Sequence, residues 1–185
     1  MKQLMVFIIG LIFWVAPSLA FAQEKKILVI YFSWSGHTRG VAQLIHQKVG
    51  GDLVELQVIK PYPTGYDDCV KQAKSEQDNQ VTPALLNPPK SLDQYDTVFL
   101  GFPNWWFSFP RPIATLLTSY DFSGKTIIPF VSHEGSRLGR SVEDIEKLAP
   151  KATVLEGLAV RGAGGSSLSQ DIDAWLAKKI AIKKS

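Results

Sequence analysis

The stretch that most constrains the fold of this chain is residues 27–44, ILVIYFSWSGHTRGVAQL. An unbroken apolar run ends in the hydroxyl- and glycine-rich segment SWSGHT, and an amphipathic helical pattern follows at once. A strand that ends in such a turn directly before a helix exposes backbone N–H groups at the positive end of the helix dipole. The stretch therefore predicts an anion site, and we expect a phosphate group. The alternative is an ordinary strand–helix turn in which Thr38 caps the helix.

The first 22 residues have the pattern of a secretory signal peptide. Lys2 supplies a positive start, residues 4–16 are apolar, and the segment AFA that ends at Ala22 has the small-x-small form of a cleavage site. We expect cleavage after Ala22, which leaves residues 23–185 as one domain in a bacterial periplasm. An uncleaved membrane anchor is the alternative, because the apolar stretch is nearly long enough to span a bilayer.

Charge and cysteine content exclude several classes of function. The formal net charge is +3, and removing Lys2 with the leader leaves about +2, which is too small and dispersed to indicate nucleic-acid binding. Cys69 is the only cysteine, so an intramolecular disulfide is impossible, and we expect a partly buried helix residue without chemistry. The three histidines are scattered and have no cysteine partners, so the sequence predicts no metal site.

Apolar runs and helical patterns alternate along the rest of the chain. Strands are predicted at residues 26–32, 95–102, 125–132 and 153–160, with a more alternating strand nearer a sheet edge at residues 53–59. Helical spacing follows the strands, with Cys69 on a modest helix and Ser141 expected to cap another helix. This alternation predicts an α/β domain with a mostly parallel sheet and helices on both faces.

Three unusual loops follow strands, at the carboxyl ends where open α/β sheets bind ligands. The first is SWSGHT; the second is PNWWFSFP, whose aromatic side chains could stack on a flat ring or pack into the core or a dimer interface. The third, SHEGSRLG, offers glycines and backbone donors. The chain lacks both GxxxxGK[ST] and GxGxxG, so a nucleoside-triphosphate loop is excluded and a dinucleotide site is disfavoured. A flat, monophosphorylated ligand fits the three loops best.

The segments YFSWSGHTRG, GFPNWW and SHEGSRLG, in this order, resemble the flavodoxin family, especially a branch with a tandem tryptophan in the second loop. The resemblance extends from about residue 26 to the last helix. It implies a doubly wound, five-stranded parallel sheet of order 2-1-3-4-5 with FMN at the switch point. Flavodoxin is itself the standard case of that topology, which is therefore taken from the resemblance and not from the residues.

The resemblance also implies a set of FMN-binding residues. The first loop, around the phosphate, contributes Ser33, Trp34, Ser35, Gly36, His37 and Thr38. The second and third loops, around the isoalloxazine ring, contribute Pro103, Asn104, Trp105, Trp106, His133, Glu134, Gly135 and Gly139. His37 stands where the family often has asparagine. Arg137 is an addition from the residues alone: it could receive an anionic substrate or lie on the surface as an ordinary arginine.

Two features depart from the electron-transfer flavodoxins that the family implies. Those proteins are strongly acidic and cytoplasmic, whereas this chain is slightly basic and carries an export pattern. We expect an exported FMN-binding redox protein that passes electrons or hydride to a small acceptor such as a quinone, with NAD(P)H as a candidate donor. The alternatives are an electron carrier for a protein partner and a binding module without flavin. A homodimer is also possible, because Trp106 or Phe107 could be dimer contacts just as well as walls of the flavin site.

Overall fold

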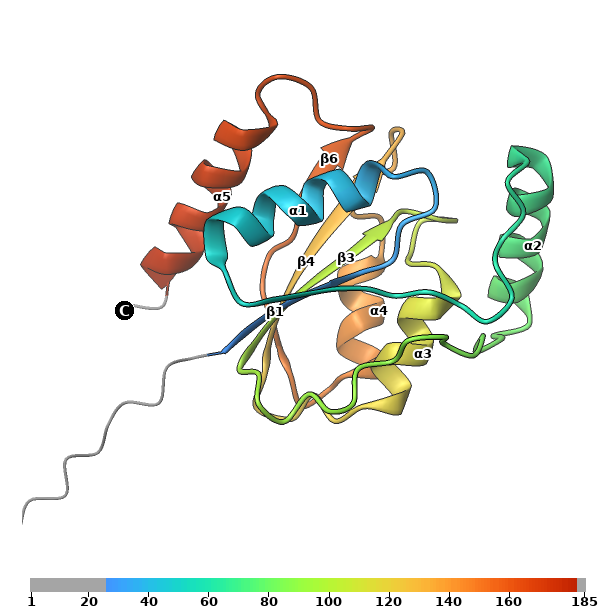
Figure 1. Cartoon of the computed structure of the whole chain (residues 1–185), viewed down its shortest axis with the longest axis horizontal. Helices are drawn as coiled ribbons and strands as arrows, with labels where there is room; N and C mark the ends of the chain where they lie inside the picture. The colour runs from blue at the N-terminus through green and yellow to red at the C-terminus, as the bar shows by residue number, and fades with distance from the viewer. Residues whose placement is uncertain (1–25, 183–185) are drawn as a thin grey trace, which may run out of the picture.

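The computed structural model describes residues 26–182, with side chains described as far as residue 178. The predicted signal peptide and its cleavage site lie outside the described residues. Parallel strands form one sheet in the order β2-β1-β3-β4-β5, and β6 also pairs with β4 (Figure 1). The strands are β1 (Ile27–Tyr31), β2 (Asp52–Glu55), β3 (Thr97–Pro103), β4 (Thr126–His133), β5 (Thr153–Val154) and β6 (Leu158–Arg161). The helices are α1 (His37–Val49), α2 (Tyr66–Asp78), α3 (Arg111–Ser119), α4 (Ser141–Leu148) and α5 (Leu168–Ile182). The predicted doubly wound fold and its strand order are confirmed.

The central strands are apolar throughout because both of their faces are covered. On β1, Leu28 and Ile30 join one core cluster, whereas Val29 and Tyr31 join the other. The first cluster includes side chains from α3 and α4, and the second includes side chains from α1 and α5. Helices therefore lie on both faces of the sheet, as Figure 1 shows.

The fifth strand was predicted as continuous over residues 153–160, and this is wrong, because the segment is divided into β5 and β6. Val154 pairs with Ile127, and Leu158 pairs with Phe130. The chain therefore advances by four residues between these pairs on the fifth strand but by only three residues on β4. Pro129 lies in this interval of β4 and has no N–H to donate. A bulge with one extra residue opposite a strand proline explains the break.

The predicted second strand, residues 53–59, is too long. β2 ends at Glu55, and only the N–H of Leu56 still reaches β1, through the carbonyl of Tyr31 at 2.7 Å. Because β1 itself ends at Tyr31, the following residues have no partner there. Instead, Val58 forms an antiparallel bridge with Leu85. The predicted edge position of the strand is confirmed by the sheet order.

The predicted cap at Ser141 is wrong, and the alternative in which Thr38 caps α1 is not found either. The N-cap of α1 is Gly36, with φ of 92°, and the Thr38 hydroxyl instead contacts Ser132 in the interior. The N-cap of α4 is Arg140, and Ser141 is the first helical residue. Its hydroxyl donates to the carbonyl of Leu138, and no side chain caps the N–H groups of α4. The partner of Ser141 is thus local, whereas that of Thr38 lies on a distant strand.

Helix α2 is set apart from the two helix layers, near the carboxyl ends of the strands (Figure 1). It turns Cys69 and Ala73 inward, which confirms the helix predicted there and the burial of the cysteine. Tyr66, the first residue of α2, is 71% exposed. Among the described residues, no helix has the length and apolar character that a membrane span requires.

Two glycine-to-alanine changes should have opposite effects on stability. A Cβ at Gly101, on central strand β3, would lie 2.1 Å from the ring of the fully buried Phe130, whereas a Cβ at Gly40 of α1 would meet nothing within 4 Å. We expect Gly101→Ala to lower the free energy of unfolding by about 1–3 kcal/mol and Gly40→Ala to raise it by roughly 0.5–1 kcal/mol. Urea denaturation of both variants measures this, and equal effects would contradict the packing described for β3.

The lone thiol should show its burial in the pH dependence of its alkylation. Burial raises the pKa of Cys69 to about 11, and the negative charge of Glu76 adds to the shift. Only the thiolate reacts, so the alkylation rate of the native chain should keep rising through pH 10, whereas in the urea-unfolded chain it should level off near the ordinary thiol pKa. Iodoacetamide labelling followed by mass spectrometry tests this. A native rate that levels off by pH 9 would show that the thiol is solvated.

Candidate functional site

The three predicted loops converge on one groove at the carboxyl ends of β1, β3 and β4. Its volume is about 680 Å³, within the roughly 300–1,000 Å³ typical of ligand sites. The groove is lined by Trp34, Ser35, His37, Tyr66, Pro103, Asn104, Trp105, Phe107, Ser132, His133, Glu134, Gly135 and Ser136. No Lys or Arg side chain of the described residues lines it.

Most of the predicted cofactor residues line this groove, and the others support it or lie beside it. Trp106 lines an adjoining cavity. Ser33 lies behind the first loop, where its hydroxyl accepts the N–H of Gly36 at 3.2 Å and that of Arg39 at 3.3 Å. Thr38 is buried, and its hydroxyl shares a 2.7 Å hydrogen bond with that of Ser132. Gly139 packs against the second loop instead of facing the groove.

The first loop presents uncharged hydrogen-bond donors. Gly36 adopts a left-handed φ of 92°, which a residue with a Cβ tolerates poorly, and the chain then enters α1 at His37. The N–H groups of His37 and Thr38 have no acceptor within residues 26–182, and Ser35 has an exposed side chain. These groups lie at the positive end of the α1 dipole, so they can bind an anion.

The arginine of this helix, Arg39, lies beside the loop but is paired with a carboxylate. Arg39 donates from Nε to Glu55 at 2.8 Å, and Glu55 also accepts the hydroxyl hydrogen of Tyr31 at 3.0 Å. This pairing raises the pKa of Arg39 further above its ordinary value, and burial together with Glu55 raises that of Tyr31 to about 12. The charge of Arg39 is therefore offset by the Glu55 carboxylate on β2. The groups that remain to bind an anion are the dipole of α1 and the N–H donors of the first loop.

The second loop is a tight turn with a strained backbone. Trp105 and Ser108 exchange both backbone hydrogen bonds, at 2.9 and 3.0 Å. The two residues between them, Trp106 and Phe107, have φ of 53° and 65°. Left-handed backbone costs a bulky side chain about 1–2 kcal/mol per residue. The turn leaves both aromatic side chains exposed, Trp106 by 42% and Phe107 by 62%.

Contacts with the third loop hold this turn in place. The Phe107 carbonyl accepts the N–H of Arg140 at 2.8 Å, and a Cβ at Gly139 would lie 2.3 Å from the same oxygen. Asn104 adds a second connection, because its Nδ2 donates to the carbonyl of Arg137 at 2.9 Å. Glycine at position 139 is therefore required by the close approach of the two loops and by its own φ of 56°.

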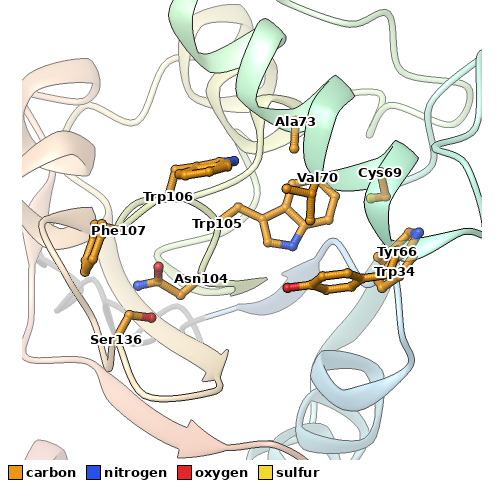
Figure 2. Close-up of a pocket in the computed structure, with 10 residues that line it drawn as sticks. All are labelled: Trp34, Tyr66, Cys69, Val70, Ala73, Asn104, Trp105, Trp106, Phe107 and Ser136. Carbon is orange, nitrogen blue, oxygen red and sulfur yellow. The ribbon is translucent and has the colours of Figure 1, made fainter.

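Asn104 also carries the one buried side-chain polar atom of the described residues that lacks a hydrogen-bond partner, Oδ1. The Nδ2 bond to Arg137 fixes the orientation of the amide, since the opposite orientation would place two oxygens together. Figure 2 shows the Asn104 side chain beside the aromatic turn, at the lining of the groove. An unsatisfied buried acceptor there is what a donor group on a bound ligand would satisfy.

His133 begins the third loop in its neutral form. Burial lowers its pKa, and the charges of Arg137 and Arg161 lower it further. Its Nδ1 accepts the N–H of Gly135 at 3.0 Å, which holds the loop in shape. His37 and Glu134 approach across the groove, with Nδ1 and Oε1 3.9 Å apart. Arg137, with φ of 53°, does not line the groove, so its predicted role in receiving a substrate gains no support from its position.

Trp105 packs against core residues, whereas the predicted stacking of a tryptophan on a flat ring stays a prediction. Trp105 makes edge-to-face contacts with Phe32 and Tyr62, at centroid distances of 5.8 and 5.1 Å, and also lines the groove. On the opposite side, Trp34 donates from Nε1 to the carbonyl of Pro63 at 2.9 Å and contacts Tyr66. The groove thus has aromatic side chains on both walls, which suits a flat ring.

A second cavity of about 280 Å³, which we call the annex, adjoins the groove on the side of α2 (Figure 2). It shares several lining residues with the groove. Its complete lining is Trp34, Tyr66, Cys69, Val70, Ala73, Asn104, Trp105, Trp106, Phe107 and Ser136. Four of these residues, Tyr66, Cys69, Val70 and Ala73, come from α2, so this helix forms one wall of the annex.

Sequence reasoning missed several lining residues, mainly Tyr66, Phe107, Ser132 and Ser136. Ser132 and Ser136 lie within the third predicted loop, SHEGSRLG, so their position in that loop was an available signal. Tyr66 had no such signal, because its helix follows a long irregular connection. Residues 26–182 contain no group of three His, Cys, Asp or Glu side chains arranged to hold a metal ion.

Comparison with known proteins places these features in a family. Residues 26–179 match the family model described as flavodoxin. A provisionally assigned flavoprotein from Bacteroides uniformis is 33% identical, covering 80% of this chain and 98% of that one, with a TM-score of 0.72. A second one, from Bacteroides eggerthii, is 31% identical, covering 82% and 96%, also with a TM-score of 0.72.

More distant relatives agree with this placement. A flavoprotein from Lactobacillus acidophilus, solved in complex with FMN, is 24% identical, covering 82% and 99%, with a TM-score of 0.64, and it shows the fold alone. The minor allergen Alt a 7 of Alternaria alternata is 30% identical over 103 residues, 54% of this chain, and the match spans about half the length of that protein. With a family model matched over nearly all of the described residues, the chain belongs to the flavodoxin family.

Proposed function

We propose that this protein binds FMN in the groove and uses it for redox chemistry with a small acceptor. The observation that carries the proposal is the convergence of all three loops on one cavity with N–H donors at one end and aromatic walls along it. Membership in the flavodoxin family supports a flavin, and the Lactobacillus relative, described in complex with FMN, supports the choice of FMN.

The residues present fit this cofactor at both of its ends. The phosphate would lie at the first loop, held by the Ser35 hydroxyl and the free N–H groups of His37 and Thr38. The ring would lie between the second and third loops, where Asn104 Oδ1 lacks a hydrogen-bond donor and Trp105 forms an aromatic wall. Bound there, FMN supplies the two-electron chemistry, whereas the chain orients the ring and excludes water.

A small acceptor is favoured over a protein partner by the charge of the site. Glu134 is the one acidic residue that lines the groove in the described part of the chain, so an acidic surface for basic partners is missing there. With NAD(P)H as donor and a quinone as acceptor, NAD(P)H, one proton and the quinone would give NAD(P)⁺ and the hydroquinone. The second candidate, an electron carrier, is favoured by the exposed Trp106 and Phe107, which a partner protein could cover.

The proposed location is the bacterial periplasm, reached by cleavage of the leader after Ala22. The support is the composition of residues 1–22 alone. Export of an unfolded chain would require FMN to bind after translocation. Amino-terminal sequencing of the periplasmic fraction tests this proposal directly.

Replacing one hydroxyl should distinguish the phosphate end of the groove from the ring end. Ser35 is exposed and makes no hydrogen bond that the loop needs, so Ser35→Ala should leave urea stability unchanged. Loss of one hydrogen bond to a charged group should weaken FMN binding by about tenfold or more. Titration of FMN with the parent chain and with the Ser35→Ala variant, followed by quenching of flavin fluorescence, measures the two affinities.

Riboflavin, which lacks the phosphate, is the matched ligand for that experiment. Its affinity should be the same for the Ser35→Ala variant and the parent chain. If both flavins lose affinity equally, the phosphate does not lie at the first loop. If the parent chain binds neither flavin, the proposed function itself fails.

Rapid mixing with NADPH should separate the reductase from the carrier. If nicotinamide reaches the flavin ring through the open side of the groove, the flavin absorbance near 450 nm should bleach within seconds. The stopped-flow trace of the FMN-loaded chain measures this rate, and dithionite reduction provides the fully bleached control. No bleaching by NADPH or NADH, together with full bleaching by dithionite, would favour the carrier.

A further inference from the structure

The annex differs from the groove in its chemistry. None of the charged side chains in the described part of the chain lines it, and on the side of α2 its wall includes Cys69, Val70 and Ala73. The thiol is neutral, because burial raises its pKa to about 11. The polar atoms available are those of Asn104, Ser136 and the aromatic N–H and O–H groups. An ion placed here would lose its hydration without gaining a partner.

One cation close to the annex, Lys74, is not among its lining residues and is already engaged. Lys74 places its Nζ 5.5 Å from the ring centroid of Trp106 and pairs with Asp78 one helical turn later. It therefore contacts the tryptophan ring and offers no free charge to a ligand. The contact also helps to hold the Trp106 ring beside the annex, where Figure 2 shows it opposite Ala73.

Size and continuity define what the annex can hold. Its volume of about 280 Å³ lies just below the range typical of drug-sized ligands, and its walls are mostly aromatic. Trp105, Phe107 and Asn104 line both the annex and the groove, so a molecule in one would contact the occupant of the other. Flat aromatic side chains favour a flat aromatic ligand, through stacked or edge-to-face contacts.

We propose that the annex binds an uncharged, flat aromatic molecule of one or two rings, next to the ring end of the groove. This assignment rests on the proposed function, for which it specifies the acceptor: a neutral aromatic compound enters between α2 and the Trp106–Phe107 turn. Anionic compounds of the same shape are rejected, because the annex has no cation to pair with them.

A redox-inert pair of probes tests this binding without depending on electron transfer. 2-Naphthamide and 2-naphthoate have the same ring system and differ in charge. On the FMN-loaded chain labelled with [¹⁵N]tryptophan, 2-naphthamide should shift the indole N–H signal of Trp106 and leave that of Trp175 unmoved. Trp175 serves as the internal reference, because it packs against Phe99 on the other face of the sheet. 2-Naphthoate should bind at least about tenfold more weakly.

Substituting a half-buried residue of α2 with lysine should invert the selectivity. Val70 lines the annex and not the groove, so Val70→Lys should weaken 2-naphthamide binding by about tenfold or more and tighten that of 2-naphthoate. Ser75→Lys, at an exposed position of the same helix that lines neither cavity, is the matched control and should change neither affinity.

The outcomes separate this inference from the proposed function. Normal FMN binding together with equal affinity for the two probes, or with no shift at Trp106, would overturn the annex assignment and leave the flavin site standing. Loss of FMN binding in Val70→Lys but not in Ser75→Lys would also overturn it, because the annex would then belong to the cofactor. Failure of the parent chain to bind FMN would instead overturn the proposed function.

Discussion

The ligand groove depends on one contact between two loops, the hydrogen bond that Arg140 N–H donates to the carbonyl of Phe107 at 2.8 Å. Two successive aromatic residues in left-handed backbone would not hold that conformation unaided, because each costs about 1–2 kcal/mol. The exchange of backbone bonds between Trp105 and Ser108 and the contact to Arg140 stabilise it. Gly139 is part of the same constraint, since any side chain there would push the two loops apart. The wall of the groove thus has a fixed shape that the rest of the fold enforces.

The electrostatics of the site follow from where its charged side chains are directed. Arg39 lies beside the first loop, but its guanidinium is paired with Glu55, which also accepts the hydroxyl hydrogen of Tyr31. The loop keeps neutral donors and the dipole of α1, which suit a permanently bound monophosphate better than a nucleotide that must be exchanged. Since the groove also lacks a ring of carboxylates, its field does little to oppose negative charge on a bound group. This is consistent with the slightly basic composition of the chain.

The sequence was sufficient to predict structural features that depend on a single segment. It was insufficient to predict features that depend on contacts between two segments. Strands β1, β3 and β4 were predictable because burial on both faces leaves an unbroken apolar run. The division of the fifth strand was not, because its cause, Pro129, lies on the neighbouring strand. The buried contact of the Thr38 hydroxyl with Ser132 was not predictable either, because the two residues are 94 positions apart and only folding brings them together. For the same reason the three site loops could be named, while the part played by α2 in the site could not.

Helix α2 links the packing of the core to both cavities. Tyr62 donates its hydroxyl hydrogen to Glu76 of α2, and the ring of Tyr62 lies edge-on to Trp105 at 5.1 Å. Gln72, also on α2, donates to the other oxygen of Glu76 at 2.8 Å and so fixes that carboxylate. A displacement of α2 would therefore widen the annex and loosen the aromatic wall of the groove together. Because Tyr66 of α2 and Trp105 border both cavities, the position of this one helix contributes to the shape of the groove and of the annex.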